Sequence, residues 1–288
     1  MSLSKFTNKG NIVVFIICAL ICFCVMQSSI FGDDTKKEIV VPKPSKGLPL
    51  AGDVFSVNGC TAFLILPEKS KISKDIPWVW YAPTLSELPG PEEKWMFQKF
   101  LDAGIAIAGI DVGESYGSPT GRANFTGLYE ELTSKRGLSK KPCLLARSRG
   151  GLMLYNWAPE HPTCVACVAG IYPVCNISSY PGISKACSAY GMTEAQLTEK
   201  LTENNPIDRL VSLAKANVPI FHIHGDTDNV VPLELNSGEL AVRYKKLGGT
   251  ITLNVIKGQG HNMWVGWFQN QDLVDFVITQ AKNGLENK

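Results

Sequence analysis

The sequence lacks a strong excess of charge of either sign. Lysine and arginine total 28 against 26 aspartate and glutamate residues, a formal net charge of +2. A nucleic-acid-binding protein normally presents a concentrated basic face, so no nucleic-acid partner is expected. Internal repeats and low-complexity segments are also missing. The apolar fraction of 45% and the charged fraction of 19% are instead typical of a globular protein with a sizeable core.

The sequence also lacks an apolar run as long as a typical membrane-spanning helix. The run from Ile12 to Met26 is shorter than the roughly 20 residues that such a helix needs. Lys5 and Lys9 precede this run and the polar Gln27-Ser28-Ser29 follows it, an order typical of a secretory signal peptide. We therefore interpret residues 1–32 as a signal peptide, or as an N-terminal anchor where it is not removed. A secreted or periplasmic protein is expected, with membrane association only through this segment.

Cysteines in a metal-binding arrangement are missing as well. Cys164-x-x-Cys167 would need a second such pair to form a zinc site. Both thiols are predicted to lie in or beside a buried strand, and no metal or organic cofactor is expected. Cys175 and Cys187 bracket a loop-like segment in a chain predicted to be exported, where disulfides persist. We predict that these two cysteines form a pair.

What the sequence does contain is a regular alternation of buried-strand and helix patterns. Strands are expected at residues 60–66, 78–82, 105–110, 143–146, 165–171, 218–223 and 250–256, and helices at 92–103, 128–135, 151–158, 233–247 and 273–281. Such alternation is typical of a mostly parallel sheet with helices on both faces. The predicted fold class is α/β, with one domain at residues 51–288 after a linker at 33–50. Residues 175–216 interrupt the alternation with two helix-like pieces, at 193–201 and 206–215, and are predicted to form a small cap.

The strongest local signal is the segment Leu144 to Leu152, in which a strand leads through Ala146-Arg147-Ser148-Arg149-Gly150 directly into a helix. A serine nucleophile on a strained strand-to-helix turn has this pattern, G-x-S-x-G, with Ala146 here in place of the first glycine. The helix N-terminus favours a developing negative charge beside the serine. Read alone, the pattern fits equally well a Ser148 that merely caps the helix.

Two later segments favour the nucleophile interpretation. His224-Gly225-Asp226-Thr227-Asp228 follows one buried strand, and Gly258-Gln259-Gly260-His261 follows the next. Open parallel sheets place their sites at the carboxyl ends of strands, so these side chains are expected to converge with Ser148. Asp226 is the alternative to Asp228 as the acid, and His222 and His224 are interpreted as core or loop histidines.

The order Ser, Asp, His resembles that of the α/β-hydrolase superfamily. The motifs H-G-x-x-D-x-x-V-P and G-x-G-H resemble most closely the branch of prolyl-oligopeptidase-like and acetylxylan-esterase-like enzymes, over essentially the whole chain after the leader. The resemblance implies that Ser148 attacks a carbonyl, that His261 transfers the proton, and that Asp228 orients the histidine. It favours Asp228 over Asp226.

The same resemblance implies an oxyanion hole and a substrate-binding rim. The backbone N–H of Arg149 is expected to be one oxyanion donor. Thr84, or the hydroxyl of Tyr81, is a candidate for the second, because Pro83 has no N–H to donate. Arg147 and Arg149 are expected either to pair with Asp111 or Glu114 or to contact the substrate.

Three further residues are candidates for substrate binding. Glu114 lies in a segment that follows a strand end, so it should line the rim of the site. Trp264 and Trp267 follow His261 closely, and they are expected either to stack on a sugar or aromatic group or to pack in the core.

These observations predict a secreted serine hydrolase that cleaves carboxylic esters through an acyl-enzyme. The expected partner is a small-molecule or carbohydrate ester, with acyl or uronoyl esters of sugars as candidates. A serine peptidase of the prolyl-oligopeptidase type is the first alternative. A non-catalytic binding protein on the same fold is the second, although a full set of Ser148, Asp228 and His261 argues against it.

Overall fold

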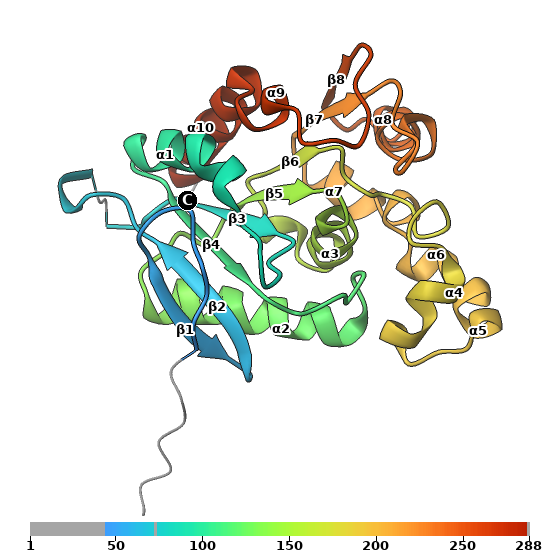
Figure 1. Cartoon of the computed structure of the whole chain (residues 1–288), viewed down its shortest axis with the longest axis horizontal. Helices are drawn as coiled ribbons and strands as arrows, with labels where there is room; N and C mark the ends of the chain where they lie inside the picture. The colour runs from blue at the N-terminus through green and yellow to red at the C-terminus, as the bar shows by residue number, and fades with distance from the viewer. Residues whose placement is uncertain (1–43, 72–73, 287–288) are drawn as a thin grey trace, which may run out of the picture. The chain divides into compact units, whose positions relative to one another are not determined.

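The computed structural model of the chain describes residues 44–71 and 74–286, so the predicted leader and the first part of the linker lie outside the described residues. Within this part, eight strands form one sheet in the order β1-β2-β4-β3-β5-β6-β7-β8 (Figure 1). The strands are β1 (Asp53–Val57), β2 (Cys60–Ile65), β3 (Trp78–Ala82), β4 (Ala106–Ile110), β5 (Cys143–Arg147), β6 (Cys167–Ile171), β7 (Ile220–Gly225) and β8 (Ile251–Ile256). In this described sheet β2 pairs antiparallel with both β1 and β4, and all the other neighbouring strands pair parallel. The predicted α/β-hydrolase-like fold is confirmed.

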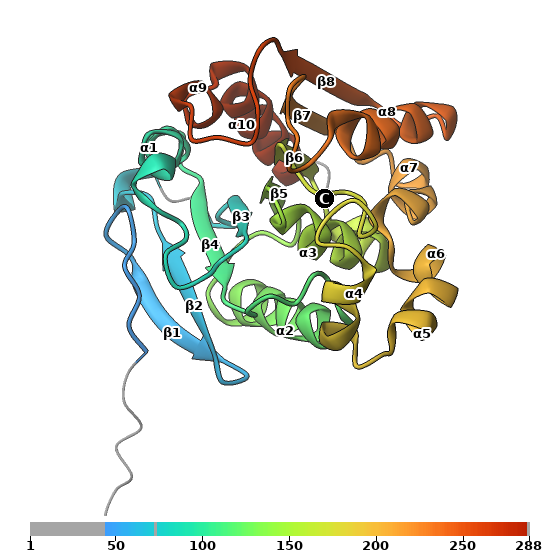
Figure 2. The same cartoon turned by 45° about the vertical axis from the view of Figure 1, so that its right-hand side comes forward.

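Helices cover both faces of the sheet because successive side chains of a buried strand point to opposite faces. Trp78 and Trp80 of β3 pack in one apolar cluster with residues of α2 and α3, whereas Val79 and Tyr81 pack in a second with residues of α1 and α10. Figure 2 shows the same division, with α2 and α3 on one side of the sheet and α1 and α10 on the other. The helices are α1 (Lys94–Asp102), α2 (Pro119–Glu130), α3 (Gly150–Trp157), α4 (Ile183–Ala186), α5 (Glu194–Glu199), α6 (Leu201–Asn204), α7 (Val211–Lys215), α8 (Ser237–Lys246), α9 (Val265–Phe268) and α10 (Gln271–Glu286).

Among the elements that differ from the sequence predictions are β1 and α2. β1 was not predicted because it is a half-exposed edge strand without a long apolar run. Its turn into β2 uses Asn58 and Gly59 with φ of 51° and 80°, the backbone that a two-residue hairpin requires. The helix expected at 128–135 begins earlier, at Pro119, because Ser118 accepts a hydrogen bond from the backbone of the first turn and proline suits that turn. Its residues Glu131–Lys135 continue as a π-helical turn.

The segment between β6 and β7 folds into short helices, α4 to α7. Its apolar side chains Ile177, Tyr190 and Leu197 form a small cluster of their own with Val174 and Leu152. The helices α4 to α6 project at the right of Figure 1. Its function as a cap, and the domain bounds given above, stay predictions.

The predicted cysteine pair is not present. Cys175 is buried and Cys187 is half-buried, and both thiols are free. The Cys187 thiol contacts the Ser184 carbonyl and the Cys175 thiol contacts that of Pro173, so each thiol is occupied by its own local backbone. Among the described residues, no helix is long and apolar enough to cross a bilayer.

Candidate active site

Ser148 occupies a tight turn between β5 and α3. Its φ of 49° lies in the left-handed region, which is strained for a residue with a side chain. The turn is held by neighbouring backbone, because the Ser148 N–H donates to the Ile171 carbonyl at 3.0 Å and the Val174 N–H donates to the Ser148 carbonyl at 2.7 Å. These bonds fix the strained turn at the carboxyl ends of β5 and β6.

The two glycines after this turn are required by close backbone contacts. A Cβ on Gly150 would lie 2.0 Å from the Ala82 carbonyl oxygen, and one on Gly151 would lie 2.3 Å from the Val174 carbonyl oxygen. The first turn of α3 is therefore pressed against the ends of β3 and β6. Glycine is therefore needed at these two positions, because the neighbouring backbone leaves no room for a side chain.

Ser148, His261 and Asp228 form one hydrogen-bonded series. Ser148 Oγ lies 2.8 Å from His261 Nε2, and His261 Nδ1 lies 2.8 Å from Asp228 Oδ2. A carboxylate only accepts hydrogen bonds, so His261 Nδ1 carries a proton. In a neutral imidazole Nε2 is then the acceptor for the Ser148 hydroxyl. This is the geometry of a nucleophile, a general base and an orienting acid.

Asp228 is held as a carboxylate by its surroundings. Burial of this carboxyl opposes ionisation, but hydrogen bonds from His224, His261 and the Val231 N–H outweigh it and lower the pKa of Asp228 below its usual value. Its Oδ1 accepts the N–H groups of Val230 and Val231 at 3.0 and 2.8 Å. The acid is therefore ionised and fixed throughout the working pH range.

Asp226, the alternative acid, lies elsewhere. It is exposed, and its carboxylate accepts the Gly258 N–H at 2.6 Å. Asp226 therefore anchors the loop that leads to His261, and Asp228 is the residue that reaches the imidazole.

The candidate oxyanion donors occupy different environments. Arg149 directly precedes α3, where the first N–H groups of a helix have no partner within the helix. Thr84 is buried in the loop after β3, and its hydroxyl donates to the Tyr81 carbonyl at 3.3 Å. The prediction for Tyr81 is wrong, because its hydroxyl is fully buried beneath the site and donates to Glu93 at 2.8 Å. Burial and the nearby Glu93 carboxylate also raise the Tyr81 pKa well above its usual value.

The two arginines have different acidic partners. Arg147 pairs with Glu93 at 2.6 Å, not with Asp111 or Glu114 as expected, and the Glu93 side chain is completely buried. Arg149 does pair with Glu114, at 3.2 Å, and both of these side chains are partly exposed. No local sequence signal identified Glu93, since it lies 54 positions from Arg147. The substrate-binding role of Glu114 stays a prediction.

The aromatic residues near His261 divide into core and surface. Trp267 is fully buried, with its ring 5.3 Å from that of Tyr172 and its Nε1 donating to Asn262. It packs in the core, so its predicted contact with substrate is wrong. Trp264 is 39% exposed. Tyr172, which the sequence did not single out, packs its ring 4.3 Å from the His261 ring.

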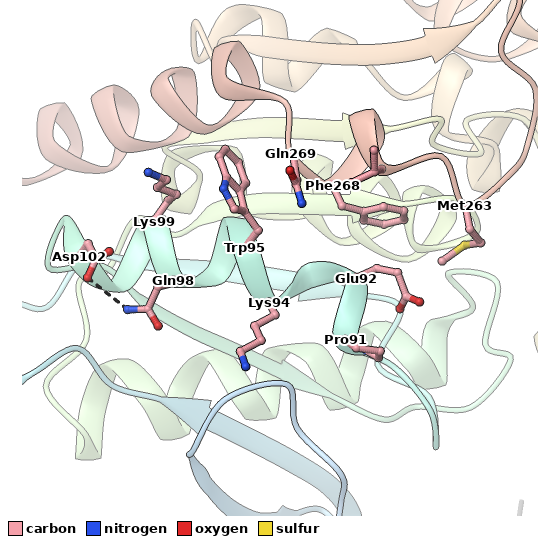
Figure 3. A pocket seen from close by; sticks show the side chains of 11 residues that line it. Pro91, Glu92, Lys94, Trp95, Gln98, Lys99, Asp102, Met263, Phe268 and Gln269 are labelled. Atoms are coloured by element: carbon pink, nitrogen blue, oxygen red, sulfur yellow. Dashed lines mark hydrogen bonds between the residues drawn. The ribbon is translucent and has the colours of Figure 1, made fainter.

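A groove lies beside the site. A cavity of about 640 Å³ is formed between α1 and the segment around α9, with Trp95, Phe268 and Met263 along it (Figure 3). A second cavity of about 510 Å³ is lined by Arg147, Arg149 and Met263. Both cavities share the residues Pro91, Glu92 and Met263. The two cavities together are called the α1 groove below, and they extend from the neighbours of Ser148 to Asp102 at the end of α1.

A serine, a histidine and an aspartate joined in this way at the strand ends of a mostly parallel sheet define an α/β-hydrolase. The chain belongs to the prolyl oligopeptidase family, whose model matches residues 133–281. That range contains the three residues of the series. Fold and family place the chain in the serine hydrolase class.

Solved structures share the fold at low sequence identity. A puromycin-hydrolyzing peptidase of Mycobacterium tuberculosis matches with a TM-score of 0.60 and 13% identity, over 81% of this chain and 40% of that one. Est1E from Butyrivibrio proteoclasticus matches with a TM-score of 0.58 and 15% identity, over 80% and 98%. MPT51 of Mycobacterium tuberculosis matches with a TM-score of 0.63 and 12% identity, over 80% and 99%. The chain thus spans less than half of the peptidase and nearly all of the other two. No curated protein sequence matches the chain.

Proposed function

We propose that the chain hydrolyses carboxylic esters through an acyl-enzyme formed on Ser148. The observation that carries this proposal is the pair of 2.8 Å contacts that joins Ser148 to His261 and His261 to Asp228.

The reaction proceeds in two displacements. Ser148 Oγ attacks the ester carbonyl carbon while its proton moves to His261 Nε2. The oxyanion accepts the Arg149 N–H, with Thr84 as the second candidate donor. Collapse breaks the bond to the alcohol, which leaves with the proton from His261. Water then attacks the acyl group by the same proton path, releasing the carboxylic acid and restoring the Ser148 hydroxyl.

An ester is the substrate that requires least of this site. A peptidase must also recognise the peptide backbone and protonate a poor amine leaving group, whereas an alcohol leaves readily. The described residues supply the nucleophile, the base, the acid and a helix N-terminus, which are the groups that an ester needs. The family match favours the alternative, a serine peptidase of the prolyl-oligopeptidase type.

We assign the apolar part of the substrate to the α1 groove. Met263 and Val265 are 50% and 58% exposed there, beside the rings of Trp95 and Phe268. Figure 3 shows Met263, Phe268 and Trp95 in a row along it. A sugar alcohol would then contact the exposed Trp264. With residues 1–32 as an export signal, such esters would be met outside the cytoplasm.

The first test compares wild type with Ser148→Ala on nitrophenyl acetate, using protein that lacks residues 1–32. The variant should lose a factor of about a thousand or more in kcat/KM, as triad nucleophiles do. Equal rates would contradict the proposed role of Ser148.

An aminoacyl-nitroanilide separates the two substrate classes. The ester hydrolase should cleave the nitrophenyl ester and leave the anilide intact. Cleavage of the anilide that depends on Ser148 would establish the peptidase instead. No Ser148-dependent hydrolysis of either compound would favour a binding protein on this fold.

A further inference from the structure

A second chain of hydrogen bonds begins at His224, which contacts Asp228 Oδ2, the same oxygen that accepts from His261. His224 Nε2 lies 3.4 Å from Asp228 Oδ2 and 2.8 Å from the Val231 carbonyl. His224 Nδ1 lies 2.8 Å from Ser237 Oγ, which lies 3.0 Å from His222 Nδ1. His222 Nε2 ends the chain 2.7 Å from the Tyr155 hydroxyl. The side chains of His224, Ser237, His222 and Tyr155 lie in the core at 0% exposure.

The Val231 carbonyl fixes the tautomer of His224. A carbonyl can only accept, so His224 Nε2 must carry the proton. The completely buried Tyr155 hydroxyl has His222 Nε2 as its hydrogen-bond partner, so Tyr155 donates its proton there and His222 carries its own proton on Nδ1. His222 Nδ1 then donates to Ser237 Oγ, and the single hydroxyl proton of Ser237 is donated to His224 Nδ1, which accepts it.

The pKa of His222 agrees with this assignment. Burial, with a smaller contribution from His224, lowers the His222 pKa to about 3, so this ring is neutral and Nε2 accepts from Tyr155. Every donor in the chain consequently points toward Asp228.

We propose that His224 and Ser237 are positioning residues of the active site: through this one-way chain of donors they hold the Asp228 loop so that the carboxylate meets His261. His224 Nε2 binds both the loop backbone at Val231 and the edge of the carboxylate. Ser237 keeps that proton on Nε2 by donating to Nδ1. The role in turnover rests on the proposed function, whereas the tautomers do not.

The tautomers are tested directly in the intact protein. The chain has four histidines, so long-range ¹H–¹⁵N NMR spectra of histidine-labelled protein can resolve each ring. We expect Nε2–H at His224 and Nδ1–H at His222 at pH 8. A His224 ring that is doubly protonated or protonated on Nδ1 would overturn the proposal whether or not any ester is cleaved.

The positioning role is tested with two isosteres of His224. The amide nitrogen of His224→Gln replaces Nε2, whereas that of His224→Asn replaces Nδ1. The rate at which a fluorophosphonate labels Ser148 reports on the activated serine without a choice of substrate. Labelling of His224→Gln should stay within about tenfold of wild type, because one neutral hydrogen bond is lost. Labelling of His224→Asn should fall about a hundredfold, as a misplaced catalytic group causes.

Ser237→Ala and Tyr244→Phe complete the set. Ser237→Ala should slow labelling about tenfold, because His224 Nδ1 then has no donor that keeps the ring proton on Nε2. Tyr244 lies on α8, as Ser237 does, and its buried hydroxyl donates to the Val218 carbonyl. Tyr244→Phe removes this hydroxyl, and the variant should be labelled at the wild-type rate. On nitrophenyl acetate, His224→Asn should lower kcat and leave KM unchanged.

Two results would overturn the positioning role. Equal labelling of the Gln and Asn variants would do so, as would wild-type labelling of Ser237→Ala. Wild-type protein that is labelled but cleaves no ester would count against the proposed function alone.

Discussion

Glu93 connects residues from several segments next to the nucleophile. Its buried carboxylate accepts from Tyr81 and pairs with Arg147, one position before the nucleophile. It also accepts the Gly90 N–H at 2.8 Å. Strand β3, the loop before α1 and the end of β5 are therefore connected through one carboxylate.

Replacing Glu93 by alanine should destabilise the protein strongly. Arg147 would be left as an unpaired charge in the core, which typically costs about 3–5 kcal/mol. Urea unfolding should show this loss. Lys135→Ala, which removes a largely exposed pair with Glu131, is the control and should have a far smaller effect. A similar small loss in both variants would contradict the role of Glu93.

At the scale of elements, the predictions succeeded where one strand or turn carries the signal. The apolar runs predicted the central strands. The strand-to-helix turn at Ser148 and the strand ends before Asp228 and His261 predicted the three residues of the hydrogen-bonded series. Contacts such as Glu93 to Arg147 and Tyr172 to His261 join distant elements, so no local pattern contains them.

The same limit explains the assignments that failed. Trp267 and Trp264 are close in sequence, yet only packing against Tyr172 determines which one is buried. A disulfide between Cys175 and Cys187 was suggested by spacing alone, whereas pairing depends on where each Cβ points.

The junction of α3 with β3 yields a second stability test. Gly150→Ala would place a Cβ 2.0 Å from the Ala82 carbonyl oxygen, so the helix start must shift. We expect a loss of about 3 kcal/mol in the free energy of unfolding, with slower labelling of Ser148. Gly47→Ala is the matched control, since its Cβ would meet nothing within 4 Å. Normal stability and labelling of Gly150→Ala would contradict the close packing.

The segment around α9 yields a test of the α1 groove. With nitrophenyl esters of increasing acyl length, kcat/KM should rise up to about fourfold per methylene that the groove covers, from about 0.8 kcal/mol each. Val265→Asp should flatten this dependence and leave the acetate rate nearly unchanged. Val242→Asp places the same charge on α8 at a position 65% exposed and should behave as wild type. An unaltered dependence in Val265→Asp would exclude the groove as the acyl site.

For the molecule as a whole, the buried His222 of β7 links stability to pH. The His222 pKa is about 3 in the folded chain because of burial, against about 6.5 when unfolded. The unfolded chain therefore binds the additional proton, so this contribution is complete above pH 6.5 and is lost as the pH falls toward 3.

Between pH 7 and pH 5, the wild-type free energy of unfolding should fall by about 2 kcal/mol more than that of His222→Asn. Urea unfolding of both proteins at the two pH values measures the difference. Parallel changes in the two proteins would show that His222 does not cause the loss.

Ser148 lies between β5 and α3, whereas the larger cavity of the α1 groove is lined by residues of α1 and of the segment around α9. The nucleophile and the lining of this cavity consequently belong to different elements. A directed-evolution library restricted to Trp95, Gln98, Val265 and Gln269 would retune which acyl groups are accepted while the reactive centre stays intact. The residues that line the groove could thus be varied to change the substrate preference without altering Ser148, His261 or Asp228.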